Sequence, residues 1–345
     1  MKVTRSCCFY LTFPGADVFL PLNCAADISA VDIGVNISRG LEWIAKHATW
    51  FLAAGVFGGI AWQTLADALA PWLEALIVMN LSLSMMRIKL AELKDYFRKP
   101  GFIAITFVFS MGIAPLILWG LILVFGVDGP LGEGIVFHAL ATPIMSAPAL
   151  CILFGLDSAL ALIITVLSYA LVPFTLPPLA LWLLGIELDV TVWELMWRLG
   201  RIVGVSFLIT LVARCTLKPA FLEAQSLRMD GIMVLGMVGV AISLMSGLPE
   251  FAAAKPSFTA LVTATTFAVN IGLQIFTAIL FWGKGRKAAV TIGLITGNTN
   301  VALVLATVSE SASYDLLVYF VVGQFPIYIL PLVAVPIYQR IVWAK

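Results

Sequence analysis

The sequence predicts an all-α polytopic membrane protein, with ten transmembrane helices arranged as two inverted five-helix repeats. The 345-residue chain is 61% hydrophobic and 11% charged, with a mean hydropathy of +1.05, whereas a soluble domain carries roughly 25% charged residues. Apolar segments of about 20 residues, the length that crosses a bilayer, recur along the chain. Two of them contain polar and helix-breaking residues at matching places in the two halves, and such broken helices mark the binding site of many secondary transporters.

Residues 1–46 precede the first apolar span and are expected to form a cytoplasmic arm. Its apolar stretch is interrupted by Pro14, Asp17 and Pro21, unlike the unbroken apolar core of a signal peptide. Disorder and an over-long gene start are two alternative interpretations of this arm. Residues 38–47 are expected to form an interfacial helix. The rest of the chain divides into a first repeat, 47–190, and a second repeat, 191–345.

Turn signals and charges divide the two repeats into ten predicted spans. These are residues 48–66, 72–90, 102–126, 131–155, 157–184, 193–214, 229–248, 257–282, 286–309 and 313–341. Seventeen of the 20 lysines and arginines then fall on one side of the membrane, and only Arg198, Arg201 and Lys255 on the other. Because basic residues concentrate in cytoplasmic loops, we expect both termini to be cytoplasmic, in a cell (inner or plasma) membrane.

Short matches between the halves indicate the repeat. The segment KPGF at 99–102, before span three, corresponds to KPSF at 255–258, before span eight, at an offset of 156. The dipeptide Phe-Leu at 51–52 recurs at 207–208 with the same offset. Since each repeat has an odd number of spans, the two halves are expected to have opposite orientations in the bilayer.

The first broken segment lies in span four. Pro143 and Pro148 each remove a backbone hydrogen bond and clash with the preceding turn of a helix. At membrane depth the freed backbone groups are tolerated only inside protein or against a water-filled cavity. We therefore expect these prolines to break the helix, and we expect Thr142 and Ser146 beside them to bind an ion or a substrate.

The second broken segment lies in span nine, where Gly293 and Gly297 are expected to break the helix. Asn298, Thr299 and Asn300 follow directly. Carbonyls of an unwound helix, together with amide and hydroxyl oxygens, are suitable ligands for a hard cation such as sodium. The expected sodium ligands are Asn298, Thr299 and Thr142. Alternatively, the polar residues of span nine only cap the two half-helices.

Further polar residues inside the spans are candidates for an ion or substrate site. They are His138 in span four, Asn270 and Gln274 in span eight, Gln324 in span ten and Asn80 in span two. A membrane histidine is a functional candidate and could carry a proton, or it could hydrogen-bond a nearby carbonyl. The polar row of span eight could line a cavity or join neighbouring helices.

Arg198 and Arg201 lie near the outer end of span six. They could meet an anion, or they could extend to the lipid headgroups.

Three segments carry a resemblance to a known family. They are VMNLSLSMMRIKLAELKDYFRKP at the end of span two, GLDSALALIITVLSYALVPFTLPPL after span four and TGNTNVALVLATV in span nine. Over residues 48–341 the chain resembles the bile acid:sodium symporter family, whose architecture auxin and arsenite efflux carriers share. The resemblance implies a panel and a core domain, each built from both repeats, with spans four and nine crossing in the core. It also implies carriage of organic anions, usually with sodium.

The sequence departs from the family pattern at both crossovers. Where sodium-coupled members carry a Ser-Asn pair, this chain has Ala147-Pro148. Where they carry a glutamate followed by Gln-Asn-Ser, it has Gly293, then Gly297 and Asn298-Thr299. The amide and the hydroxyl are therefore present, and the carboxylate is absent.

We therefore expect a secondary active transporter that moves a small organic anion by alternating access, with sodium as coupling ion and no other cofactor. A proton-coupled or uncoupled carrier, or a non-transporting sensor, are the alternatives. The sequence contains no recognisable catalytic set, phosphate-binding loop or basic tail, so an enzyme, an ATP-driven pump and a nucleic-acid-binding protein are not predicted. The expected partners are the substrate and the lipid bilayer, without an obligatory protein partner.

Overall fold

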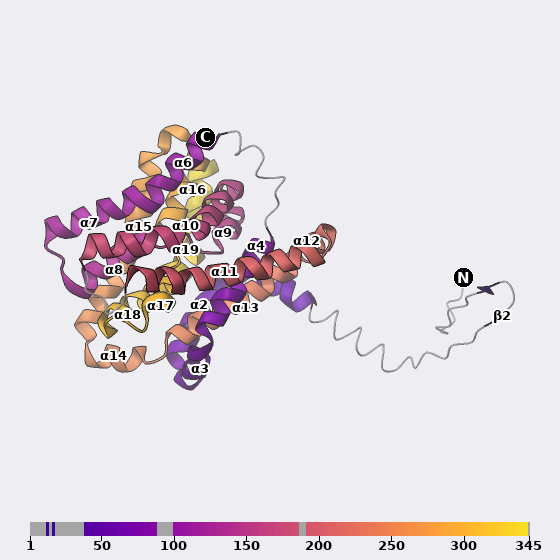
Figure 1. Ribbon diagram of the computed structural model, residues 1–345, viewed down its shortest axis with the longest axis horizontal. Helices are drawn as coiled ribbons and strands as arrows, with labels where there is room; N and C mark the ends of the chain where they lie inside the picture. Colours follow the sequence, from indigo (N-terminus) through magenta and orange to yellow (C-terminus); the bar gives the residue numbers. More distant parts are fainter. Residues whose placement is uncertain (1–11, 14–15, 18–37, 88–98, 186–190, 344–345) are drawn as a thin grey trace.

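The computed structural model describes residues 12–13, 16–17, 38–87, 99–185 and 191–343 (Figure 1). These residues are helical apart from connecting turns and two paired two-residue strands, Thr12–Phe13 (β1) and Ala16–Asp17 (β2). The helix expected at residues 38–47 is present as Ser38–Lys46, and it meets the next helix at a bend of 87°. Residues 1–11, 14–15 and 18–37 of the predicted arm lie outside the described part of the chain.

The helices of the first half precede residue 186. They are α2 (Ala48–Ala61), α3 (Gln63–Leu69), η1 (Ala70–Trp72), α4 (Leu73–Met86), α6 (Pro100–Val108), η2 (Phe109–Ile113), α7 (Ala114–Phe125), α8 (Gly129–Leu140), α9 (Ala147–Phe154) and α10 (Ser158–Leu184). Those of the second half are α11 (Val192–Thr216), α12 (Pro219–Ala224), α13 (Ser226–Leu244), α14 (Leu248–Ala254), α15 (Pro256–Leu280), η3 (Trp282–Lys284), α16 (Arg286–Gly297), α17 (Val301–Val308), α18 (Tyr314–Val322) and α19 (Gln324–Trp343).

Within the described residues, seven helical segments are long and apolar enough to cross a membrane, and the bent pair of Ser38–Lys46 with α2 would make eight. The seven segments are 63–86, 100–125, 158–184, 192–216, 226–254, 256–280 and 314–342. They coincide with seven of the ten predicted spans. In the other three, the helices α2, α8, α9, α16 and α17 have 14 residues or fewer, because the chain bends or breaks there. A multi-pass helical membrane protein is confirmed, and the ten-span inverted repeat stays a prediction.

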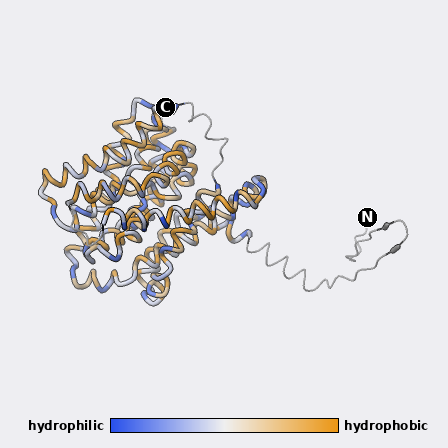
Figure 2. The backbone as a smooth tube through the Cα atoms, viewed as in Figure 1, coloured by the Kyte–Doolittle hydropathy of each residue, from blue (hydrophilic) through white to orange (hydrophobic). Residues whose placement is uncertain are grey.

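Apolar side chains cover the outside of the helices as well as their interior. Val124 and Ile279, for example, are 79% and 68% exposed. Hydrophobic residues run along most of each helix, and hydrophilic residues gather at turns and helix ends (Figure 2). A continuous apolar surface of this extent is unfavourable in water, and a bilayer removes that cost.

The packing separates two groups of helices. α13 packs along α2 and α4, and α4 packs along α11, which makes a four-helix group of α2, α4, α11 and α13. The crossing group contains α6 to α10 and α15 to α19, with α15 packed along α16. The groups contact each other most extensively where α10 meets α11 and where α19 meets α2, and α17 also contacts α4 and α11.

Candidate functional site

The first interruption separates α8 from α9. Ala141 is extended, with φ −67° and ψ 147°, and Thr142 precedes Pro143, whose ring disfavours the helical conformation of the residue before it. α9 then begins at Ala147, with Pro148 in its first turn. A proline is well tolerated there because the first amides of a helix have no partner in the helix. Pro143 therefore lies in the break, whereas Pro148 begins the second half-helix, which corrects its expected role.

The second interruption separates α16 from α17, and it falls after the two glycines. Gly293 lies inside α16 and Gly297 is its last residue, so Gly293 does not break the helix as predicted. A Cβ atom at either position would lie 2.4 Å from a backbone carbonyl oxygen of α15. The glycines thus permit close packing of α16 on α15. Asn300 caps α17, since its side-chain oxygen accepts the Leu303 amide at 3.3 Å.

The two interruptions lie directly against each other. Pro143 and Thr299 form an isolated antiparallel bridge. The Ile144 amide donates to the Asn298 carbonyl at 3.0 Å, and the Asn300 amide donates to the Thr142 carbonyl at 2.7 Å. We call residues 141–146 and 298–300 the crossing. Backbone groups that the breaks release from helices are thereby paired with each other, as burial requires.

His138, on the last turn of α8, is fully buried beside the crossing. Its Nε2 donates to the Gly297 carbonyl at 3.1 Å, and its own carbonyl accepts the Thr299 hydroxyl at 2.8 Å. These two hydrogen bonds therefore join the C-terminal end of α8 to the C-terminal end of α16 and to the segment that follows it. This is the arrangement in which the histidine hydrogen-bonds a nearby carbonyl, and it leaves Nδ1 without a partner.

A row of amides leads from the crossing to the surface of α15. Asn270 Nδ2 donates to Asn298 Oδ1 at 3.3 Å, and Gln274 Nε2 donates to Asn270 Oδ1 at 2.5 Å. The Tyr338 hydroxyl of α19 donates to Gln274 Oε1. The structure therefore brings the two predicted amides of span eight to Asn298, and it adds Tyr338, which the sequence did not indicate.

Tyr169 is a second residue that sequence reasoning missed. Its hydroxyl accepts from Asn300 Nδ2 at 2.7 Å and donates to the Pro143 carbonyl at 3.2 Å, so it contacts both interruptions. The signal was its place in the middle of the apolar span of α10. A tyrosine hydroxyl buried at that depth needs a protein partner.

Three polar atoms at the crossing have no hydrogen-bond partner among the residues that the structure describes: Thr142 Oγ1, Ser146 Oγ and Asn298 Nδ2. All three side chains are buried. Among the described residues, the buried polar side chains are amides, hydroxyls and one imidazole, and no cluster of His, Cys, Asp or Glu could hold a metal ion. A cation at the crossing would therefore be coordinated by neutral oxygens.

Two predicted site residues are used elsewhere. Asn80 bonds the Leu76 carbonyl at 2.8 Å and lies against Gly236, inside the four-helix group. Gln324 bonds the Phe320 carbonyl at 3.3 Å, between α18 and α19. Neither has a hydrogen bond to the crossing. From α4, Ser84 reaches it instead, and its hydroxyl donates to the Met145 carbonyl at 3.0 Å.

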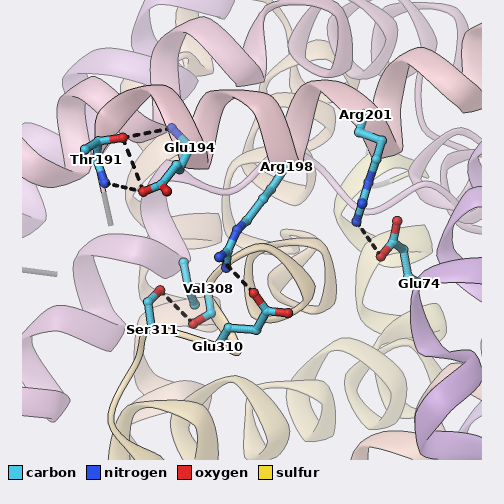
Figure 3. A network of polar contacts seen from close by, with 8 residues as sticks. All are labelled: Glu74, Thr191, Glu194, Arg198, Arg201, Val308, Glu310 and Ser311. Atoms are coloured by element: carbon cyan, nitrogen blue, oxygen red, sulfur yellow. Dashed lines mark hydrogen bonds and ion pairs between the residues drawn. The ribbon is translucent and has the colours of Figure 1, made fainter. Parts of the chain in front are cut away.

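The two arginines of α11 line a cavity of about 740 Å³ between the four-helix group and the end of α17. Arg198 pairs with Glu310 at 2.8 Å, and Arg201 pairs with Glu74 at 3.0 Å (Figure 3). We call this space the arginine cavity. Glu194 also lines it, but its carboxylate accepts hydrogen bonds from Thr191 at the start of α11 (Figure 3). An anion would have to displace a glutamate to reach either arginine.

The sequence model described as the Sodium Bile acid symporter family matches residues 74–249, about half of the chain. The matched stretch contains the first interruption and helices α4, α11 and α13 of the four-helix group. The second interruption follows it. A search of curated proteins found no match.

Proposed function

The chain belongs to the sodium bile acid symporter family, and on this premise we propose that it is a secondary active transporter that moves a small organic anion by alternating access. The observation that carries the proposal is the crossing. Two helix interruptions pair through their backbones inside the protein, and three buried polar atoms beside them lack a partner. Such paired breaks are the usual binding site of transporters built from repeats.

Alternating access requires a path to the crossing from either side. The arginine cavity lies at the start of α4, beside Glu74, and a smaller cavity of about 170 Å³ lies at the other end of α4, beside Ser84 and Arg87. Both cavities lie between the four-helix group and the crossing group. Movement of one group against the other would open one cavity and close its counterpart.

The electrostatics of the broken helices support an anionic substrate. α9 begins directly after Ser146 and α17 directly after Asn300, so two helix N-termini adjoin the crossing. The positive end of a helix dipole favours a negative charge. The C-terminal ends of α8 and α16 lie at the same place, where their carbonyls favour a cation.

Sodium is the proposed coupling ion, with Asn298, Thr299 and Thr142 as its ligands. Neutral oxygens and unwound carbonyls are adequate ligands for a weakly held cation, and a bound carboxylate substrate would complete the site. The family's glutamate has no room at Gly293, because a side chain there would collide with the Gln274 carbonyl. Proton coupling through His138 and uncoupled exchange are the alternatives.

We further propose ten membrane crossings in two inverted repeats, 47–190 and 191–345, with a cytoplasmic arm at 1–46 and both termini in the cytoplasm. Helix starts support the repeat: α6 begins at Pro100 and α15 at Pro256, and α10 begins at Ser158 and α18 at Tyr314, each pair 156 residues apart. The four-helix group corresponds to the panel and the crossing group to the core, in a cell (inner or plasma) membrane.

The test is uptake by proteoliposomes that contain the purified full-length protein. Radiolabelled carboxylates and a bile acid are supplied under a sodium gradient, and then under a fixed proton gradient with choline in place of sodium. We expect accumulation that requires sodium. Undiminished uptake in choline would exclude sodium coupling. Ligand-induced thermal stabilisation of folded protein without any uptake would favour a sensor over a transporter.

A further inference from the structure

An apolar groove of about 410 Å³ lies between α15 and α19 and shares no lining residue with the arginine cavity. Ile275 and Ile279 of α15 form one wall, Ile337 of α19 forms the other, and Leu294 of α16 contributes to the floor. These helices are neighbours in the fold (Figure 1). The three isoleucines are exposed, so the groove opens toward the acyl chains of a surrounding bilayer. Its volume falls in the usual range for small-molecule sites, roughly 300–1,000 Å³.

Three polar residues, Gln274, Asn298 and Tyr338, also line the groove, and one of their donors is unused. Tyr338 donates to Gln274, Gln274 donates to Asn270, and Asn270 donates to Asn298 Oδ1. This row of hydrogen bonds ends at Asn298, which lines the groove, is 2% exposed and has no partner for its Nδ2. A buried donor without an acceptor is unfavourable. An acceptor on a molecule in the groove would satisfy it.

Two helix ends adjoin Asn298, because α16 ends at Gly297 and α17 begins at Val301. The partial charges of these two ends have opposite signs, so the helix dipoles alone do not select the charge of a ligand. The groove thus offers an apolar trough with one hydrogen-bond donor at its deep end.

We propose that this groove binds a single-chain amphiphilic carboxylate from the bilayer. Its hydrocarbon chain lies between α15 and α19, and its carboxylate accepts a hydrogen bond from Asn298 Nδ2. The ligand enters sideways from the lipid, so its chain does not cross water. This binding site is inferred from the groove itself and does not depend on transport. Its use as a lateral entrance for a transported substrate rests on the proposed function.

The probe is dodecanoate that carries a photoreactive diazirine on its chain. It is added to the full-length protein in phosphatidylcholine nanodiscs, and labelled residues are mapped by mass spectrometry after illumination. We expect labelling to concentrate on the groove-facing residues of α15, α16 and α19, and excess unlabelled dodecanoate to remove it. Labelling spread evenly over the lipid-facing helices, or resistant to competition, would mean ordinary contact with lipid and would overturn the proposal.

Substitutions that fill the groove provide the matched comparison. Ala278→Trp fills it from α15 and Ala334→Trp fills it from α19, so each should abolish the excess labelling if the variant folds. Ala264→Trp is the control, because Ala264 is exposed on α15, 14 residues from Ala278 and outside the groove. Equal labelling in all three folded variants would overturn the proposal.

Asn298→Leu tests the carboxylate contact, because leucine is branched at the same carbon as asparagine but carries no hydrogen-bond donor. We expect about tenfold weaker competition by dodecanoate, the effect of losing one hydrogen bond of good geometry, and unchanged labelling by a hydrocarbon diazirine without a carboxylate. Equal affinity of dodecanoate for both forms would remove Asn298 from the site. Uptake measured on the same preparations keeps the two proposals apart. Uptake without groove labelling would refute the ligand site in the groove and leave the transport proposal standing. Groove labelling without uptake of any carboxylate would refute transport and leave the ligand site standing.

Discussion

Pro143 and Thr299 are partners in the only isolated bridge among the described residues, and they lie 156 positions apart. The same offset relates the KPGF and KPSF segments that precede spans three and eight. The two hydrogen bonds beside the bridge follow it too, since Ile144 corresponds to Asn300 and Thr142 corresponds to Asn298. If each residue is replaced by its counterpart in the other half, the bond from Ile144 to Asn298 becomes the bond from Asn300 to Thr142. A two-fold axis through the bridge would impose this relation, and it supports the proposed inverted repeat.

The bridge predicts that cysteines at Thr142 and Asn298 crosslink with a short bifunctional reagent. The measurement uses a background without native cysteines, because Cys151 and Cys215 are free thiols. Thr142→Cys paired with Thr259→Cys is the control. Thr259 lies 11 residues from Asn270 on α15, about 16 Å along the helix axis. If the control pair crosslinks and the pair at residues 142 and 298 does not, the contact between the two helix interruptions is contradicted.

Gly293→Ala is expected to lower the thermal stability of the protein by about 1–3 kcal/mol, as overpacking does. The added methyl group would approach the Gln274 carbonyl to 2.4 Å, and α16 would have to move away from α15. Gly272→Ala is the matched control, because nothing lies within 4 Å of its added Cβ. Replacement of a helical glycine by alanine in open space is neutral or stabilising. Equal melting temperatures for both variants in one detergent would show that α15 and α16 are not closely packed at Gly293.

The two ion pairs of the arginine cavity are expected to differ in function although they are alike in chemistry. Arg198–Glu310 joins the four-helix group to the crossing group, whereas Arg201–Glu74 lies inside the four-helix group. Each exposed pair should contribute at most about 1 kcal/mol to stability. If the groups move against each other, Arg198→Gln should change the uptake rate severalfold, and Arg201→Gln should leave it nearly unchanged. The charge-reversed pair, Arg198→Glu with Glu310→Arg, should restore the original rate. Equal effects of both single variants would contradict this difference.

His138→Ala is expected to destabilise the protein by about 1–3 kcal/mol, because it leaves the buried Gly297 carbonyl without its donor. If sodium drives transport, residual uptake by this variant keeps its sodium dependence. His47→Ala is the control. His47 is the other histidine of the chain and is exposed, and its ring Nδ1 donates to the Trp43 carbonyl. Uptake that follows a proton gradient in the wild type and loses that response in His138→Ala would favour proton coupling.

The sequence was sufficient to predict the class of protein and both interruptions. Spans and breaks depend on local composition, and a proline or a run of Asn and Thr inside an apolar segment is visible in the chain itself. The exact places of the breaks depend on tertiary contacts. Gly293 looked like a helix breaker, because the sequence does not reveal the α15 carbonyl that a side chain would meet.

Partners distant in the chain were the least predictable part of the site. Tyr169 and Tyr338 looked like ordinary apolar residues of long spans, although their hydroxyls bond Asn300 and Gln274. Asn80 looked like a polar edge of a cavity and instead packs against Gly236. In each case the sequence shows the residue type, but it does not show which residues of a neighbouring helix the side chain contacts.

The crossing is held by main-chain hydrogen bonds, which no substitution short of proline removes. Its side chains can therefore be exchanged while the scaffold persists. The backbone frame of the crossing is thus independent of the chemistry of the side chains that it carries. This independence makes the protein a suitable starting point for engineering, because new ion or substrate preferences could be selected at residues 142, 146 and 298 without redesign of the fold.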